Sequence, residues 1–170
     1  MSGIIQSLIG SLKSAAATAT DAYYNLVTLL LNTSSTNGAQ NNTFLDSSSN
    51  NFTITRNGNT TQGTFTPFSQ TGWSNYFAAS SNYLSTTSIS LPSNFTVEFW
   101  INWNSLLTNY NPLCGGADTA NTQLFITTKV DGTGLRFGKT GVAEYANAPF
   151  TWQVGVWYHV AVVRNSNAIK

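Results

Sequence analysis

The stretch Asn94-Phe95-Thr96-Val97-Glu98-Phe99-Trp100-Ile101-Asn102-Trp103-Asn104 decides the fold class of this chain. Along it large apolar and polar side chains alternate, with Phe95, Val97, Phe99, Ile101 and Trp103 on one face. A period of two is typical of a half-buried β-strand and not of a helix. Five large apolar groups on one face need a second layer to cover them, so we predict a β-sandwich. A further strand, predicted at Val156–Arg164, is the candidate for covering this face.

Composition limits the classes of protein to which the chain can belong. Its 170 residues are enough for one sizeable domain with its own core. Charged residues make up only 8% of the chain, whereas about a quarter is usual, but 13% aromatic and 41% hydrophobic residues argue against disorder. The net charge is +1 and the basic residues are scattered singly, so we expect neither nucleic acid nor a membrane surface as a partner.

Residues 3–22 are predicted to form a helix, because apolar residues recur there at spacings of three and four. The stripe that we expect to serve attachment or oligomerisation consists of Ile4, Ile5, Leu8, Ile9, Leu12, Ala15 and Ala19. A helix of this length is marginal in water unless its stripe is buried. Three alternatives stay open: it packs on its own domain, it docks on a partner or on copies of itself, or it is disordered in the free chain. A signal peptide is disfavoured because no positive charge precedes the stripe and Lys13 interrupts it.

Beyond the helix the pattern is that of many short strands. Tyr23–Leu31 is predicted to be a buried first strand, with the end of a long helix as the alternative. Further strands are expected at Thr43–Leu45, Phe52–Arg56, Gly63–Phe65, Asn75–Phe77, Tyr83–Leu84, Phe95–Trp103, Leu124–Val130, Leu135–Gly138, Ala143–Tyr145 and Val156–Arg164. Asn57-Gly58 is a strong turn signal, and Asp131-Gly132-Thr133-Gly134 should close a hairpin. So many short strands and turns indicate an antiparallel sandwich or barrel.

Three blocks of this sequence resemble the laminin-G-like, concanavalin A-like jelly-roll superfamily. The first is Leu29–Asn32 followed by Phe44-Leu45-Asp46-Ser47-Ser48 and Phe52-Thr53-Ile54; the second is Tyr76–Leu84; the third pairs Phe95–Trp103 with Trp157–Arg164 as the family's central strands. The resemblance covers 26–170. It implies a mainly β, antiparallel jelly-roll domain (25–170), which the helical N-terminal segment (1–24) predicted from the apolar spacing precedes. Because the chain stops at Lys170, within what the family makes a hairpin, we expect the domain to be incomplete at its C-terminal end.

Two segments look further like the version of this domain carried by tailed-phage fibres and other virion proteins. They are Thr66–Ser69 and Gly72–Phe77. The resemblance implies a non-enzymatic structural protein of a tail fibre, tail or head appendage on the particle exterior, with other virion proteins and copies of itself as partners. The chain departs from the family pattern at Ala78 and Asn82, where acidic residues are expected.

The chemistry-bearing residues argue against an enzyme. Of six acidic residues, Glu98 has no acidic neighbour two or four positions away, although a glycosidase needs two carboxylates across the sugar bond. His159, the only histidine, shares a strand face with Trp157, Ala161 and Val163, and we expect it to be buried. Cys114 in a predicted loop has no identifiable base, and one cysteine with one histidine cannot form a zinc site. No cofactor is expected beyond calcium, for which Asp46, Asp118 and Asp131 are the candidates.

Sugar binding is the commonest activity that the resemblance implies, and it relies on exposed aromatic rings beside polar groups. Trp100 lies on the polar face of its strand between Glu98 and Asn102, which is unusual for a face in solvent. These three residues, with Trp73 and Tyr110, are the candidates for contact with a host-surface glycan or a partner. Two alternatives stay open: the N-terminal segment or a partner covers the face of Trp100, and the loop aromatics plug the ends of the sandwich.

Overall fold

A computed structural model of the chain describes residues 21–33, 42–63, 66–68, 73–87, 89–106, 112–115, 124–129, 133–139, 143–166 and 168–170. Their contacts divide the chain into two compact units, Met1–Thr87 and Ser88–Lys170. The helix predicted at 3–22, with its seven apolar stripe residues, lies outside the described residues apart from the last two positions. Within the described ranges no helix has the length and apolar character needed to cross a membrane.

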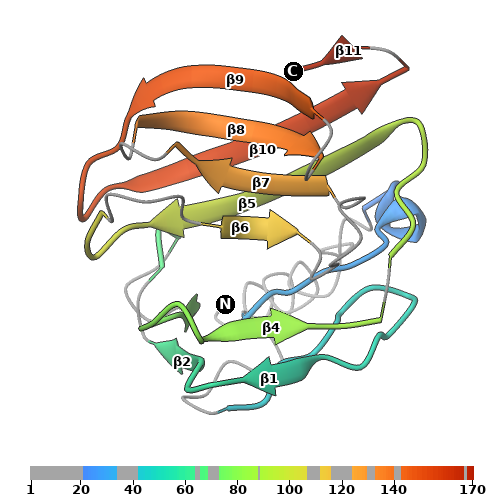
Figure 1. Cartoon of the computed structure of the whole chain (residues 1–170). Coiled ribbons are helices and arrows are strands. Elements are labelled where there is room, and N and C mark those ends of the chain that lie inside the picture. Colours follow the sequence, from blue (N-terminus) through green and yellow to red (C-terminus); the bar gives the residue numbers. More distant parts are fainter. Residues whose placement is uncertain are drawn as a thin grey trace, which may run out of the picture. The chain divides into compact units, whose positions relative to one another are not determined.

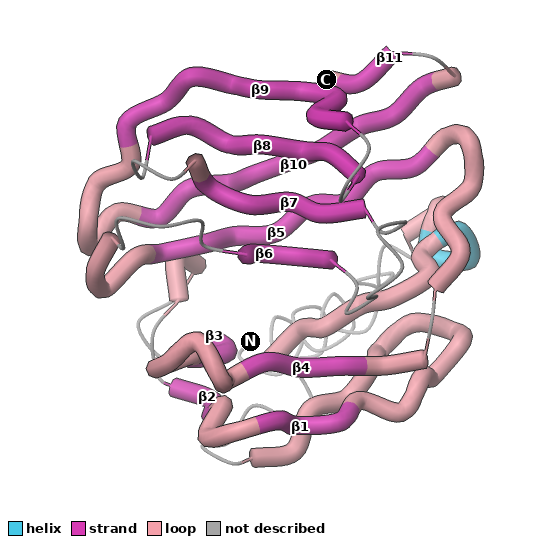
Figure 2. Tube along the Cα trace, in the orientation of Figure 1, coloured by secondary structure: helices cyan, strands magenta, loops and turns pink. Residues whose placement is uncertain are grey.

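The second unit consists of two antiparallel sheets (Figure 1). One has the order β11-β10-β5 and is formed by β5 (Phe95–Asn102), β10 (Trp157–Asn165) and β11 (Ala168–Ile169). The other has the order β6-β7-β8-β9 and is formed by β6 (Pro112–Gly115), β7 (Leu124–Thr128), β8 (Thr133–Lys139) and β9 (Ala143–Thr151). Figure 2 shows these four strands lying side by side across β5 and β10. The prediction of a mainly β, antiparallel structure is confirmed, and it is consistent with a jelly roll.

The core of this unit lies between the two sheets. Its most buried members are Ile126 on β7, Phe137 on β8 and Val162 on β10, and Phe95, Val97 and Phe99 of β5 pack against them. Burial along β5 alternates residue by residue from Phe95 to Trp100, as the sequence predicts.

One prediction about this core is wrong: β10 does not cover β5. It is the antiparallel neighbour of β5 in the same sheet, with Val160 opposite Phe99 and Val162 opposite Val97. The cover is the four-stranded sheet. The apolar face of β10 therefore extends the apolar face of β5 sideways, as in the paired central strands that the family resemblance implies.

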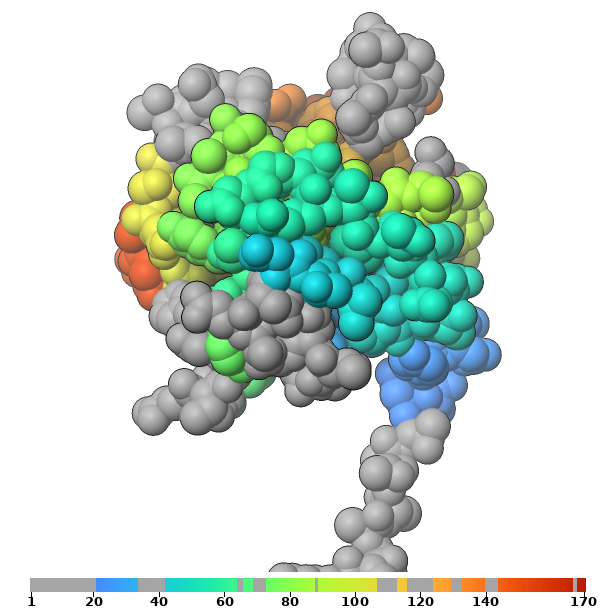
Figure 3. Space-filling view, turned by 90° about the horizontal axis from the view of Figure 1, so that it is seen from below, coloured from blue at the N-terminus to red at the C-terminus, as the bar shows by residue number. Residues whose placement is uncertain are grey.

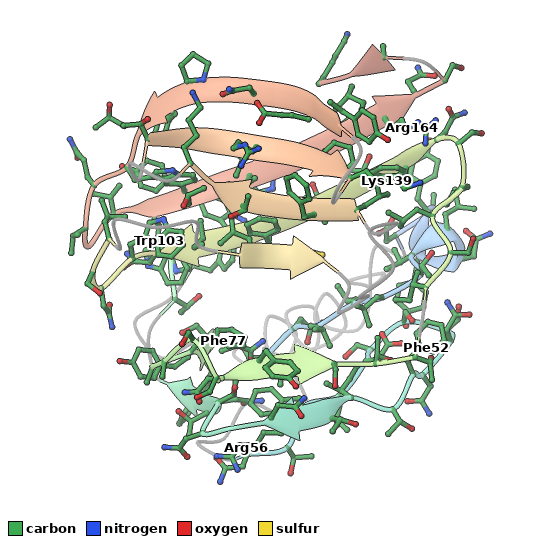
Figure 4. The ribbon with its side chains drawn as sticks, in the orientation of Figure 1. Phe52, Arg56, Phe77, Trp103, Lys139 and Arg164 are labelled. Atoms are coloured by element: carbon green, nitrogen blue, oxygen red, sulfur yellow. The ribbon has the colours of Figure 1, made fainter. Side chains whose placement is uncertain are left out.

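A cluster of aromatic rings lies where the strands β5, β9 and β10 begin or end. Trp152 is buried, and its ring meets Phe150, Tyr158 and Trp103 edge to face at centroid distances of 5.1, 5.1 and 6.0 Å. Its indole Nε1 donates a hydrogen bond to the carbonyl oxygen of Gly134 at 3.0 Å, so the polar atom of this buried ring has a partner. Trp103, labelled in Figure 4, follows the last residue of β5.

The first unit holds two small antiparallel sheets. β1 (Thr55–Asn57) pairs with β4 (Tyr83–Ser85), and β2 (Thr61–Gly63) pairs with β3 (Ser74–Tyr76). In Figure 3 the residues from 42 to 63, in cyan and blue-green, form one continuous surface. The strands predicted near Phe52–Arg56, Asn75–Phe77 and Tyr83–Leu84 are present, with their ends shifted by a few residues. Of the predicted strand Gly63–Phe65, only Gly63 is described, as the last residue of β2, and the strand predicted at Thr43–Leu45 is wrong because these residues belong to no strand.

The predicted buried strand at Tyr23–Leu31 is wrong. Tyr24–Leu26 is a single turn of 3-10 helix, and the Leu26 side chain is 71% exposed. The turn forms because Asp21 accepts the backbone N–H of Tyr23 on its carboxylate, at 2.9 Å, and that of Tyr24 on its carbonyl, at 3.2 Å. Residues 27–33 belong to no sheet strand and bend at Thr28. Side chains there take up backbone groups that a sheet would use, since Asp46 accepts the N–H of Leu30 and the Ser48 hydroxyl donates to the carbonyl of Thr28.

Candidate functional site

The most distinctive surface of the second unit is the outer face of the β5–β10 pair. Phe95, Val97, Phe99 and Val162 point into the core, so the alternate residues point outward. They are Thr96, Glu98, Trp100 and Asn102 of β5 and Trp157, His159, Ala161 and Val163 of β10, and we call this surface the Trp100 face. Glu98, Trp100 and His159 are all exposed on it.

Three side chains form a connected group on the Trp100 face. His159 lies directly opposite Trp100 in the antiparallel register, and the two ring centroids are 5.1 Å apart with an interplanar angle of 37°. The Nε2 atom of His159 is 3.5 Å from Oε2 of Glu98. An indole ring therefore lies beside an imidazole, which in turn lies beside a carboxylate, and 45% of Trp100 stays exposed to solvent.

The prediction that His159 is buried is wrong, since 44% of its side chain is exposed. It does share a face with Trp157, Ala161 and Val163, but this is the outer face. The alternate set on β10 includes Val160 and Val162, which are both buried. Both faces of β10 are largely apolar, so its sequence alone could not tell which one meets the core.

The other residues that the sequence predicts for glycan contact do not form one exposed surface with Trp100. Asn102 lies on the Trp100 face opposite Trp157, but its Oδ1 and Nδ2 are both buried and neither has a hydrogen-bond partner among the described residues. Trp73 belongs to the first unit, where its carbonyl oxygen accepts a hydrogen bond from the hydroxyl of Thr33. Tyr110 lies outside the described residues. Of the sequence candidates, only Glu98 and Trp100 are thus both described and exposed on this face.

Asp46, a candidate calcium ligand, is instead the centre of a hydrogen-bonded loop in the first unit. Its carboxylate is buried and accepts the backbone N–H groups of Leu30, Ser48 and Phe52, each at 2.9 Å, and the Ser48 hydroxyl at 2.8 Å. Burial by itself raises the pKa of this carboxyl group, but the four hydrogen bonds outweigh it and hold the pKa below its ordinary value. The charged Asp46 carboxylate thus joins the backbone at Leu30 to the backbone at Ser48 and Phe52.

The same loop is held by a second set of side chains. The Ser48 hydroxyl and the Asn50 side-chain amide both donate to the carbonyl oxygen of Thr28, at 3.0 and 2.9 Å. The backbone N–H of Ser47 donates to the carbonyl of Leu30 at 2.8 Å. These contacts give the segment Asp46-Ser47-Ser48 a physical role in loop structure.

The other acidic groups that the structure describes do not gather at one place. Glu144 of β9 is paired with Arg136 of β8, whose guanidinium carbon lies 5.6 Å from the centroid of the Phe125 ring. Within the described ranges no three histidine, cysteine or acidic residues come together in a group that could hold a metal ion. Asp118 and Asp131, the other two calcium candidates, lie outside those ranges. Cys114 is in β6 and not in a loop.

Comparison with known proteins supplies one match. Residues 78–170 match the laminin-G-type family model described as the concanavalin A-like lectin/glucanases superfamily. The matched range contains all of β4 through β11 and therefore the whole Trp100 face. Neither the curated proteins nor the solved structures gave a match to this chain.

Proposed function

The chain belongs to the concanavalin A-like lectin/glucanases superfamily, and on this premise we propose that it is a non-enzymatic carbohydrate-binding protein whose sugar site is the Trp100 face. The observation that carries the proposal is the large exposed indole of Trp100, flanked by His159 and Glu98 on a regular sheet. A rigid strand pair holds these side chains in fixed positions, which favours recognition of a shaped ligand.

The chemistry of the three side chains suits a sugar ring. The apolar C–H face of a pyranose can lie on the indole, which removes apolar surface of both from water. The hydroxyl groups at the rim of the sugar can then donate to the Glu98 carboxylate and exchange hydrogen bonds with the His159 imidazole. A ligand with a carboxylate of its own would meet the negative charge of Glu98 at short range, so we expect neutral sugars to bind better than acidic ones.

The absence of enzymatic activity is part of the proposal. Within the second unit the described carboxylates are Glu98 and Glu144, which lie on different sheets. Glu144 is moreover paired with Arg136. A glycosidase uses a pair of carboxyl groups across the sugar bond, whereas the described titratable neighbour of Glu98 on the sugar-binding face is the imidazole of His159, so we expect Glu98 to orient a hydroxyl group and not to cleave the bond. Incubation of the protein with the oligosaccharides it binds should therefore release no new reducing ends.

The decisive experiment compares two aromatic residues of nearly equal exposure. The full chain is applied to a broad glycan array together with Trp100→Ala and Phe77→Ala, since Phe77 is 48% exposed and belongs to the first unit (Figure 4). We expect Trp100→Ala to weaken binding by about 30-fold, as for a central aromatic contact, and Phe77→Ala to leave it unchanged. Silence of the array at high protein concentration, or equal binding by both variants, contradicts the proposal.

We propose in addition that this protein is displayed on the exterior of a tailed-phage particle, as part of a fibre, tail or head appendage. The support is the resemblance at Thr66–Ser69 and Gly72–Phe77 together with the apolar stripe from Ile4 to Ala19. Deleting residues 1–22 should abolish incorporation into particles while the remaining protein stays folded and soluble. Normal incorporation of the truncated protein contradicts this role without affecting the sugar site.

A further inference from the structure

The Trp100 face extends beyond the tryptophan for which it is named, because β5 and β10 lie side by side along their paired residues (Figure 1). Residues that are directly opposite each other on this face form four rows, and two residues of each strand separate one row from the next. In order along the strands the rows are Asn102 with Trp157, Trp100 with His159, Glu98 with Ala161, and Thr96 with Val163. Adjacent rows are about 6.7 Å apart, so about 13 Å separates the first row from the third. A ligand that contacts both must be longer than one sugar ring.

The first row supplies a second indole besides that of Trp100. Trp157 is half-buried and belongs to the outer face of β10. It occupies the diagonal position relative to Trp100, since its direct partner Asn102 is two residues from Trp100 on β5. Diagonal neighbours in an antiparallel pair are close enough for aromatic side chains to meet a common ligand. A sugar ring on Trp157 would therefore be next to a ring on Trp100.

The third row offers an exposed carboxylate beside a small side chain. Glu98 is opposite Ala161, and 63% of the Glu98 side chain is exposed. Ala161 is itself exposed and is the smallest residue of the Trp100 face, between His159 and Val163 on the same side of β10. A sugar ring can thus approach the sheet over the Ala161 methyl group while its hydroxyl groups donate to the carboxylate. Together the first three rows offer successive contacts to one chain of sugar rings.

We propose that the ligand of the Trp100 face is a straight chain of at least three neutral pyranose rings joined by β-1,4 linkages, which presupposes the sugar site proposed above. In such a chain the linkages are equatorial, so successive rings form an extended ribbon whose C–H faces can lie flat on a sheet. Two indoles and a methyl group give that ribbon an apolar contact in each of the first three rows. An α-1,4-linked chain curls, so its successive rings turn away from a flat surface.

Isothermal titration calorimetry of the full chain with soluble oligosaccharides of one to four rings tests this length dependence. The cello-, manno- and chito-oligosaccharides have β-1,4 linkages, whereas the malto-oligosaccharides, which consist of the same glucose units as the first series, have α-1,4 linkages. We expect at least one β-1,4 series to bind about 30-fold more tightly with three rings than with one, since two further rows are contacted. A fourth ring should add little, and maltotriose should bind as weakly as glucose.

The outcomes separate this ligand class from the sugar site itself. If array glycans bind through Trp100 but no β-1,4 series gains affinity with length, the straight-chain ligand is overturned and the sugar site stands. A gain in the malto series equal to that in the cello series overturns it as well. If Trp100→Ala does not weaken glycan binding at all, the sugar site fails, and the straight-chain ligand fails with it.

A substitution in the third row assigns the gain in affinity to this face. Ala161→Arg places a long side chain across the row, where its guanidinium can pair with Glu98 directly opposite. We expect the ratio of the affinities for three rings and for one ring to fall from about 30 to about 5 or less. Ala78→Arg, the same change at an exposed position of the first unit, should retain the ratio.

Trp157→Ala tests the first row in the same way and should also lower the ratio. Because Trp157 is half-buried, far-ultraviolet circular dichroism first checks that this variant keeps the β-structure of the unsubstituted protein. An unchanged ratio in Ala161→Arg overturns the straight-chain ligand, whatever the result for Trp157→Ala.

Discussion

The carboxylate of Asp46 receives four hydrogen bonds while almost wholly buried, and its replacement is the sharpest test of the first unit. Asp46→Asn keeps the size of the side chain but turns one acceptor oxygen into an NH2 group that faces donors. We expect the free energy of unfolding to fall by about 2–4 kcal/mol, because buried hydrogen bonds to a charged group are lost. Urea denaturation measures the loss.

The pH dependence of this contribution follows from the direction of the pKa shift. The folded-state pKa of Asp46 lies below its unfolded value of 3.8, so its stabilisation is fully present above that pH. It is lost as the pH falls through the folded-state pKa. Asp46→Asn should therefore flatten the fall in stability below about pH 4. If the free energy of unfolding of Asp46→Asn falls as steeply below about pH 4 as that of the unsubstituted protein, this role of Asp46 is contradicted.

Gly58 and Gly155 form a matched pair for testing close packing. Both have positive φ angles, of +66° and +78°, but a Cβ at Gly58 would lie 2.4 Å from Asn82 Oδ1, whereas at Gly155 it would meet nothing within 4 Å. We expect Gly155→Ala to cost about 1 kcal/mol from backbone strain alone, and Gly58→Ala about 3 kcal/mol from strain and steric clash together. A Cβ at Gly58 would also lie 2.6 Å from the backbone carbonyl oxygen of Ser81, so equal losses in denaturant unfolding would show that both Asn82 and this carbonyl move aside freely.

Two adjacent valines of β10 test which of its faces meets the core. Val162 is buried in the core cluster, while Val163 belongs to the Trp100 face. Threonine has nearly the shape of valine, so Val162→Thr mainly buries a hydroxyl group and should lower the free energy of unfolding by about 2 kcal/mol. Val163→Thr should change it by about 0.5 kcal/mol or less. A larger loss for Val163→Thr than for Val162→Thr would mean that Val163, and not Val162, faces the core.

Strand prediction succeeded where one face was plainly more polar than the other. On β5 the alternation of apolar residues with Thr96, Glu98 and Asn102 fixed both the strand and its inward face. On β10 the strand was predicted, but its inner face was not, because valine occurs on both sides.

Near Leu26 the apolar run indicated a buried strand, whereas a local Asp21 turn and the Asp46 loop determine the structure there. β6 was missed because Pro112 and Gly115 in a four-residue strand resemble a loop.

The candidate site was predictable in part for the same reason. Trp100 and Glu98 could be found from the alternation of β5, since an indole on the polar side of a strand is conspicuous. The contribution of His159 depends on the register between two strands that are 55 residues or more apart, which no local pattern reveals.

The division of the chain into two units predicts how a fragment behaves. Every strand pairing of β5 to β11, and every member of the core cluster, falls within 88–170. We therefore expect the fragment 88–170 to fold alone, with the amide hydrogens of β5 and β10 protected from exchange. An exchange experiment that finds no protected amides in this fragment contradicts the expectation.

A slightly longer fragment provides the control. Residues 78–170, the range of the family match, add β4 without its partner β1. The amides of Tyr83–Ser85 should then exchange rapidly in the fragment 78–170 but slowly in the full chain. The protection of β5 and β10 should be the same in both fragments.

The edge-to-face cluster around Trp152 is an intrinsic spectroscopic probe of side-chain packing in the second unit. Of the five tryptophans, Trp100, Trp103, Trp152 and Trp157 belong to the second unit and Trp73 alone to the first. Rings held at interplanar angles of 76° to 89° are coupled chromophores in a fixed asymmetric arrangement, and their near-ultraviolet circular dichroism disappears when packing is lost. That signal should therefore follow the melting of the second unit, whereas the fluorescence of a variant whose only tryptophan is Trp73 should follow the first.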